Sequence, residues 1–200
     1  AMLARSELEV GHPVQPLRPV RPLPVELQPS DAGRVRPQYL FHRIQQLIVE
    51  GTDVPVMAES GNAFAWAINA LRFETPGRFR VSSSFGSMGH FCCGVVGAAL
   101  GRQGKAVAIV GDGSLLMNNE ISTASQYGAA AVWVVLNDGQ YGMVAQGMKA
   151  LGFAPPPEAS FPEADFAAIA RGMGGDGVRV TREADLDVVV LVGAVRHLGG

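Results

Sequence analysis

The chain has 200 residues, of which 48% are hydrophobic and 17% charged, and its formal net charge is −2. This composition is typical of a globular chain with enough residues for one well-cored domain. Without a basic block, the sequence offers no surface that would follow a nucleic-acid backbone. Its longest apolar runs are shorter than the roughly 20 residues of a membrane span, and its start lacks the pattern of a secretory signal.

The only two cysteines, Cys92 and Cys93, are neighbours in the sequence. Adjacent cysteines rarely form a structural disulfide, and one pair cannot supply the four ligands of a zinc or iron–sulfur site. We therefore expect two small apolar side chains on a helix, and a cytoplasmic location as the default.

Proline-rich residues 1–36 predict an extended linker or tail, because proline breaks helices and central strands. The domain itself is predicted from residue 37 to residue 200. Its first helix is expected where apolar residues recur at helical spacing, at Leu40, Phe41, Ile44, Leu47 and Ile48.

Short apolar segments alternate with helical patterns along the rest of the chain. Strands are predicted at 54–58, 79–83, 106–110, 131–136 and 177–180. Helices are predicted at 61–71, 90–100, 114–127, 140–150 and 163–173, and from Thr181 onward. This alternation predicts an α/β fold, with a doubly wound, mostly parallel sheet and helices on both faces. Because no strand follows the last helix, the domain is expected to lack its last strand.

Two Asp-Gly pairs follow two successive apolar segments, in GDGSLL (111–116) and in NDGQYGM (137–143). The carboxyl ends of adjacent parallel strands lie about 5 Å apart, so the carboxylates of Asp112 and Asp138 would converge. Facing carboxylates repel each other unless a cation lies between them. Mg²⁺ prefers oxygen ligands and keeps part of its coordination shell for phosphate or water. The two pairs therefore predict a shared magnesium ion.

The glycines around Asp112 would let a ligand approach the backbone closely. Ser114 lies where a helix is expected to begin, so exposed N–H groups there would face an anion. A metal ion beside a helix start predicts a diphosphate site. One Asp-Gly pair alone would be ordinary turn chemistry. A nucleotide-binding domain is disfavoured because GDGSLL supplies neither G-x-G-x-x-G nor a Walker lysine.

These segments resemble the thiamine diphosphate-dependent enzymes of the acetolactate synthase and pyruvate decarboxylase type. The family's GDG motif and its later Asn-Asn or Asn-Asp pair are similar to residues 111–113 and to Asn137-Asp138. SSSFGSMGHFCCGVVGAALG (82–101) and AESGNAFAW (58–66) resemble two further segments, in the family's order. The resemblance covers roughly residues 35–197 and implies one domain, the one that binds the diphosphate.

The resemblance implies thiamine diphosphate and Mg²⁺ as cofactors. The implied magnesium ligands are the side chains of Asp112 and Asp138 and the backbone carbonyl of Gln140. The residues implied to contact the cofactor are Ser60, Gly61, Asn62, Gly86, Met88, Gly111, Gly113, Ser114, Tyr141, Gly142 and Met143. Met88 would fill the angle between the two rings of the bent cofactor, and the alternative is that it fills the core.

The catalytic residues of the family are not expected in this chain. Ala63 stands where a histidine is often found. His90 is interpreted as a structural histidine, with a catalytic role as the alternative. Neither Glu59 nor Glu120 matches the glutamate that activates the cofactor in the family.

In the family that glutamate comes from a pyrimidine-binding domain, of the same or another subunit. We therefore interpret the chain as the diphosphate-binding part of a 2-oxo acid decarboxylase or carboligase similar to acetolactate synthase. It would be a fragment or one subunit of a split enzyme, inactive alone. The implied partners are a 2-oxo acid substrate, a pyrimidine-binding domain and further copies in a homo-oligomer. The alternative is a non-catalytic module that binds thiamine diphosphate or regulates another protein.

Overall fold

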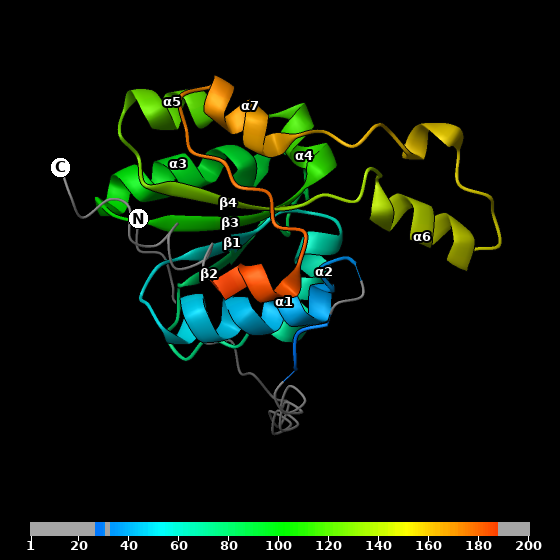
Figure 1. The fold of residues 1–200 in the computed structure, drawn as a ribbon, viewed down its shortest axis with the longest axis horizontal. Coiled ribbons are helices and arrows are strands. Elements are labelled where there is room, and N and C mark those ends of the chain that lie inside the picture. The colour runs from blue at the N-terminus through cyan, green and yellow to red at the C-terminus, as the bar shows by residue number, and fades with distance from the viewer. Residues whose placement is uncertain (1–26, 31–32, 188–200) are drawn as a thin grey trace, which may run out of the picture.

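The computed structural model describes residues 27–30 and 33–187. One sheet of four parallel strands has the order β2-β1-β3-β4. Helices lie on both faces of this sheet (Figure 1), so the predicted doubly wound α/β fold is confirmed. The strands are β1 (Val56–Ala58), β2 (Phe79–Val81), β3 (Ala106–Gly111) and β4 (Ala131–Leu136).

Most of the helices are short, and one of them is extended by a segment of wider geometry. The α-helices are α1 (Pro37–Ile44), α2 (Asn62–Ala70), α3 (His90–Arg102), α4 (Asp112–Met117), α5 (Ile121–Gln126), α6 (Gly142–Ala150) and α7 (Phe166–Gly172). α1 continues as a π-helical segment, η1 (Gln45–Glu50), and two 3₁₀ turns are η2 (Pro157–Ala159) and η3 (Glu183–Asp185). Among the described residues, no helix combines the length and apolar character that crossing a membrane requires.

The central strands are apolar throughout because both of their sides are buried. Val56, Ala58, Val107 and Ile109 pack with α1 and α2 in one hydrophobic cluster. Met57 and the alternate residues of β3 pack with α3 in a second cluster on the opposite face. Because the sheet lies between these two clusters, its strands have the apolar pattern from which four of them were predicted.

The prediction of a strand at 177–180 is wrong. After α7 the chain descends past the strands to η3, beside α1 (Figure 1), without pairing with the sheet. Gly177 packs so tightly against α7 that an added Cβ would lie 2.4 Å from the carbonyl oxygen of Ala167. Of the two valines that suggested a strand, Val178 is 66% exposed and Val180 packs on the cluster of α1 and α2.

The single helix predicted at 114–127 is instead two helices, α4 and α5. Asn118 is extended, with φ −158° and ψ 131°, and its side chain lies against Gly89, where an added Cβ would be 2.9 Å from the Cβ of Asn118. Asparagine side chains compete with helical hydrogen bonds, which favours such a break.

An N-terminal strap, residues 27–30 and 33–36, leads into α1. Glu183 of η3 is 1% exposed and accepts hydrogen bonds from the strap. Its carboxylate accepts the N–H groups of Ser30 (2.7 Å) and Arg36 (2.9 Å), and two bonds of 2.8 Å from the Arg36 guanidinium. These bonds fasten the strap to the segment that follows α7. The linker predicted for 1–36 and the helix predicted from Thr181 otherwise lie outside the described residues.

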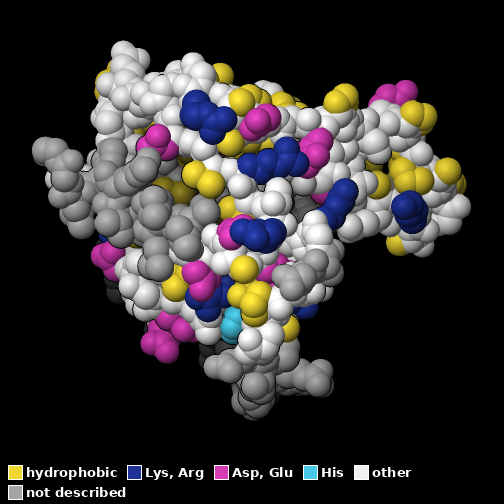
Figure 2. All heavy atoms as spheres, in the orientation of Figure 1, with side chains coloured by type: hydrophobic (Ala, Val, Ile, Leu, Met, Phe, Trp, Pro, Cys, Tyr) yellow, Lys and Arg dark blue, Asp and Glu magenta, His cyan; other side chains and the backbone are white. Residues whose placement is uncertain are grey.

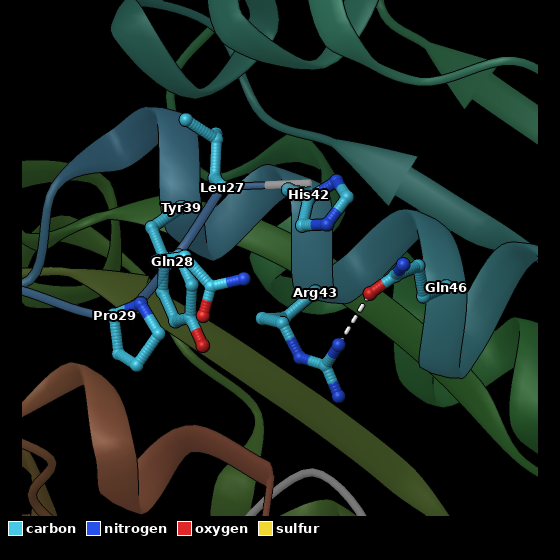
Figure 3. A pocket seen from close by; sticks show the side chains of 7 residues that line it. All are labelled: Leu27, Gln28, Pro29, Tyr39, His42, Arg43 and Gln46. Carbon is cyan, nitrogen blue, oxygen red and sulfur yellow. Dashed lines mark hydrogen bonds between the residues drawn. The ribbon is translucent and has the colours of Figure 1, made fainter. Parts of the chain in front are cut away.

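The strap and α1 border an open hollow of about 180 Å³ (Figure 3). It is lined by Leu27, Gln28, Pro29, Tyr39, His42, Arg43 and Gln46. Arg43 donates to Gln46 and forms an ion pair of 2.6 Å with Asp187. The charge of Arg43 is therefore neutralised within the protein, and none of the predicted site residues lines this hollow.

We expect Glu183→Gln to lower the free energy of unfolding by about 1–3 kcal/mol at neutral pH, because buried N–H donors lose their charged acceptor. The hydrogen bond from the Arg36 side chain, with those from the backbone N–H groups, lowers the pKa of Glu183 from 4.5 to about 2. A lowered folded-state pKa stabilises the fold above the unfolded pKa. The advantage of Glu183 over glutamine is therefore complete above about pH 4.5 and decreases as the pH falls toward 2.

Urea denaturation at several pH values between about 7 and 3 measures this dependence. Glu163→Gln is the matched control, because the ion pair of Glu163 with Arg179 is half exposed on both sides. Such an exposed pair contributes at most about 1 kcal/mol. A stability difference between wild type and Glu183→Gln that stays constant over this pH range would contradict the expectation.

Gly177→Ala is expected to destabilise the protein by about 1–3 kcal/mol, because its Cβ would overlap the backbone of α7 and one of the two segments must move. Gly172→Ala is the control, since an added Cβ at Gly172 meets no heavy atom within 4 Å. Thermal denaturation of both variants tests the packing of residues 174–180 on α7. Equal melting temperatures would contradict it.

Candidate functional site

The candidate site lies at the carboxyl ends of β1, β3 and β4, where α2, α4 and α6 begin (Figure 1). β3 and β4 pair in register up to Gly111 and Leu136. The sequence positions directly after this pair are Asp112 on one strand and Asn137 on the other. The end of β1 adds the turn of Ser60, Gly61 and Asn62 to the same edge.

The carboxylate of Asp112 joins the ends of β3 and β4. Asp112 is 2% exposed. Its Oδ1 accepts the N–H of Gly113 at 2.7 Å, and its Oδ2 accepts the N–H groups of Asp138 at 3.0 Å and Gly139 at 2.6 Å. Carboxylate oxygens have further lone pairs, so these bonds leave Asp112 able to bind a cation.

Asp138 lies at the surface beside Asp112. Desolvation raises the pKa of Asp138 above its ordinary value, the hydrogen bond from the Gln140 side chain lowers it, and the Asp112 carboxylate raises it. The net shift of this pKa is upward, which means that desolvation, together with the neighbouring Asp112 carboxylate, disfavours the negative charge of Asp138. A divalent cation between the two carboxylates would reverse this effect.

Residues 159–161 hold the loop after β4 from its outer side. Gly139 accepts the N–H of Phe161 at 2.9 Å, and Tyr141 donates its N–H to Ala159 at 2.8 Å. The two segments form an antiparallel bridge at Gln140 and Ser160, and the ring of Tyr141 packs edge to face on Phe161 at 5.1 Å. Gly139 adopts φ +67°, a conformation that favours glycine. The backbone of Gln140 is thereby fixed beside the two carboxylates.

Two of the predicted glycines allow side chains from other elements to come close. A Cβ at Gly113 would lie 2.6 Å from Cε1 of Tyr141 and 3.4 Å from Cε of Met88. A Cβ at Gly142 would lie 2.8 Å from Nδ2 of Asn62 and 3.0 Å from Oδ2 of Asp138. Predicted residues from four different loops therefore meet around the pair of carboxylates.

The remaining predicted residues differ in how accessible they are. Ser114 is buried in α4, Ser60 is half-buried, and Met143 is exposed on α6. Gly61 precedes α2 with φ +86°, and Gly86 lies in the loop after β2 with φ +69°. These residues lie on the same edge of the sheet, but they take no part in the two close contacts at Gly113 and Gly142.

The acids and the histidine that the sequence offers for proton transfer have structural partners. Glu59 is fully buried and accepts three backbone N–H groups. Glu120 accepts a hydrogen bond from Thr123 at the start of α5. His90, the first residue of α3, is exposed and packs edge to face on Phe91.

Sequence reasoning missed two features of the site. One is the support from residues 159–161, which lie in a proline-rich segment without helical or strand periodicity. The other is the side chain of Asn137, whose Nδ2 donates to the carbonyl of Ala164 at 2.9 Å. Its buried Oδ1 has no hydrogen-bond partner among the described residues. The Asn-Asp pair itself was the available signal for Asn137.

Two carboxylates, those of Asp112 and Asp138, lie beside each other at this edge. Among the described residues, no group of three or more His, Cys, Asp or Glu side chains could hold a metal ion. A cation here would therefore need further ligands besides these two side-chain acids, such as a backbone carbonyl and phosphate or water. This is the coordination that Mg²⁺ commonly has in proteins.

Comparisons with known proteins identify the family. The family model described as "Thiamine pyrophosphate enzyme, C-terminal TPP binding domain" matches residues 59–194. The Mycobacterium tuberculosis protein IlvB2, named as an acetolactate synthase large subunit, is 33% identical over 173 residues, which are 85% of this chain and 31% of that protein. Benzoylformate decarboxylase of Pseudomonas aeruginosa is 28% identical over 200 residues, 98% of this chain and 36% of that protein.

The fold is also that of a solved member of this group. The crystal structure of benzoylformate decarboxylase from Polynucleobacter necessarius matches with a TM-score of 0.67 and 22% identity, over 76% of this chain and 30% of that one. The chain thus spans about a third of the length of the relatives it matches. Its converging loops and the family match lead to one conclusion: the chain belongs to the thiamine pyrophosphate enzymes, as a C-terminal TPP-binding domain of the kind found in acetolactate synthases and related decarboxylases.

Proposed function

We propose that residues 37–200 hold the diphosphate of thiamine diphosphate through one Mg²⁺, with residues 1–36 as a linker. The observation that carries this proposal is the juxtaposition of Asp112 and Asp138, joined by hydrogen bonds of 3.0 Å and 2.6 Å from Asp138 and Gly139 to Asp112. Asp112, Asp138 and the backbone carbonyl of Gln140 would be the metal ligands, and diphosphate oxygens would complete the coordination.

The arrangement of the loops supports a defined orientation of the cofactor. Because Gly113 and Gly142 have no side chain, Met88 and Tyr141 lie close to the backbone of Gly113, and Asn62 and the Asp138 carboxylate lie close to that of Gly142. Met88 and Tyr141 would cover the backbone at Gly113 and exclude water from one side of the diphosphate. The proposed cofactor contacts are Ser60, Gly61, Asn62, Gly86, Met88, Gly111, Gly113, Ser114, Tyr141, Gly142 and Met143.

The chemistry proposed for the complete protein is the decarboxylation of a 2-oxo acid, with or without transfer to an acceptor carbonyl. When bound, thiamine diphosphate supplies the carbon acid whose anion attacks the 2-oxo acid. This chain contributes binding, orientation and a cation. Its acids near the site are engaged in hydrogen bonds, so the activating acid would come from a pyrimidine-binding domain of the same or another subunit.

Exposed apolar side chains near the site support the presence of such a partner. Phe85, in the loop after β2, is 91% exposed, and Met117, at the end of α4, is 66% exposed. Figure 2 shows further hydrophobic side chains on the arm that carries α6, where Val144, Leu151 and Phe153 are exposed. Apolar patches of this kind typically mark surfaces that other proteins cover. A homo-oligomer would cover them with the pyrimidine-binding domain of another copy.

The engagement of the acids also favours the alternative of a non-catalytic module that binds thiamine diphosphate. The two functions differ in their response to a pyrimidine-binding domain, which would restore turnover only in the enzyme.

A cytoplasmic location stays a prediction that depends on the cysteine content.

We expect the chain to bind thiamine diphosphate weakly and only when Mg²⁺ is present. Asp138→Asn should weaken this binding at least roughly tenfold, equivalent to about 1.4 kcal/mol, because a ligand charge is lost. Isothermal titration calorimetry with Mg²⁺ and with a chelator measures both effects. Asp53→Asn is the control, since Asp53 is exposed and precedes β1, at the opposite end of that strand. Binding that persists in chelator would contradict the metal assignment.

We expect no release of carbon dioxide and no acetolactate when the chain is incubated with Mg²⁺, thiamine diphosphate and pyruvate. The reason is that Glu59 and Glu120, the glutamates near the site in the described part of the chain, already accept hydrogen bonds from the protein. Turnover should appear only when a pyrimidine-binding domain is added. Turnover by the chain alone that is lost in Glu120→Gln would instead locate the activating acid in this chain.

A further inference from the structure

Glu59 is the most deeply buried acid near the candidate site. It directly follows β1 and is 0% exposed. Its Oε1 accepts the N–H of Ser60 at 3.0 Å, and its Oε2 accepts the N–H groups of Phe91 at 2.9 Å and Cys92 at 3.1 Å. A buried carboxylate without such donors would be strongly unfavourable, so the three bonds fix its position.

The bonds of Glu59 connect segments that are far apart in the sequence. Ser60 begins the turn that leads into α2, whereas Phe91 and Cys92 belong to the first turn of α3. The backbone N–H of Glu59 also donates to the carbonyl of Ile109 in β3, at 2.9 Å. One residue thereby links the turn after β1, the start of α3 and the strand that delivers Asp112.

The first turn of α3 has free N–H groups of the kind that bind anions in many proteins. Here the carboxylate of Glu59 accepts two of them. An incoming phosphate could use these donors only by displacing a buried carboxylate. These two donors are therefore not available to an anionic ligand, which would instead bind the cation proposed between the two aspartates.

We propose that Glu59 is a positioning residue, which holds the loop of Gly86–Gly89 and the turn of Ser60–Asn62 at a fixed separation so that both contact the same cofactor. This inference rests on the proposed function. Met88 lies three residues before Phe91, and Asn62 lies two residues after Ser60. A shift of α3 relative to β1 would therefore move Met88 away from Gly113, or Asn62 away from Asp138.

The environment of Glu59 supports this role rather than proton transfer. Burial and the nearby Glu59 carboxylate raise the pKa of the Cys92 thiol, which therefore stays protonated. The carbonyl of Cys92 accepts the indole N–H of Trp133 of β4, at 2.8 Å. The start of α3 is thus held between Glu59 and β4, and Trp133 is an intrinsic fluorescence probe of its position.

The charge and the position of Glu59 predict opposite effects when the carboxylate is replaced. If only its charge mattered, Glu59→Gln would strengthen the binding of an anionic diphosphate, because a nearby negative charge is removed. If Glu59 positions the two loops, the same change weakens binding, because the glutamine NH₂ group is a donor that cannot accept the N–H bonds. The sign of the change therefore separates the two explanations.

The test measures the affinity of the chain for thiamine diphosphate with Mg²⁺, and for inorganic pyrophosphate with Mg²⁺, by titration at a temperature where every variant is folded. We expect Glu59→Gln to lose roughly 10–100-fold in affinity for thiamine diphosphate, as supporting residues of ligand sites commonly do. Glu59→Asp keeps the charge with a shorter reach and should recover part of the loss.

Glu183→Gln is the matched control, because Glu183 is also a buried glutamate that accepts backbone N–H groups from a distant segment, but on the side of α1. It should bind within about twofold of wild type, since it changes stability without touching the loops. Equal losses in Glu59→Gln and Glu183→Gln, or an unchanged or higher affinity in Glu59→Gln, would overturn the positioning role.

Amide hydrogen exchange without any ligand tests the link independently of the cofactor. Glu59→Gln, or Glu59→Asp if the glutamine variant does not fold, should exchange faster than wild type at both 60–62 and 86–92. Faster exchange at only one of these segments would refute the link. If wild type binds no thiamine diphosphate, the proposed function fails, while the exchange result still decides whether Glu59 couples the two segments.

Discussion

Two neighbouring parallel strands end at the same edge of the sheet, but their loops need not stay together unless something joins them. In this protein the carboxylate of Asp112 provides the connection, through backbone N–H groups of its own turn and of the loop after β4. Charged acceptors form stronger hydrogen bonds than neutral ones, especially when the acceptor is buried. The position of Asp138, of Gln140 and of the start of α6 depends on this connection.

Close packing extends the arrangement outward from the two strand ends. Residues 159–161 hold the loop after β4 on one side, and the side chains of Met88 and Asn62 reach it from the loops after β2 and β1. The contacts of Met88 and Asn62 need the space left by Gly113 and Gly142, whereas Gly139 contributes a backbone conformation with positive φ. The carboxylate of Glu59 adds a second internal anion, which fills the start of α3. The site is therefore organised by hydrogen bonds within the chain, without a contribution from a cation or a phosphate.

The parts of this structure that depend on local sequence patterns could be predicted. β3 and β4 are apolar runs because both faces of the sheet are buried, and their ends were marked by Asp-Gly pairs, so the convergence of Asp112 and Asp138 followed from strand adjacency. The break at Asn118 and the false strand at 177–180 depend on contacts with Gly89 and with the backbone of α7, which no periodicity records. That Glu59 is not the activating acid of the family stays a prediction. The three hydrogen bonds of Glu59 could not be foreseen, because two of them come from residues more than thirty positions away.

The attachment of the strap to Glu183 has a mechanical consequence. Tension applied through residues 27–30 would first load the bond from Ser30 to Glu183 of η3, and then the bonds of Arg36, which directly precedes α1. Several hydrogen bonds that converge on one carboxylate share such a load and break together. Movement of a body attached through the strap would therefore be resisted at Glu183 and Arg36, on the face of the sheet that α1 covers, and not at the strand edge that carries the carboxylates.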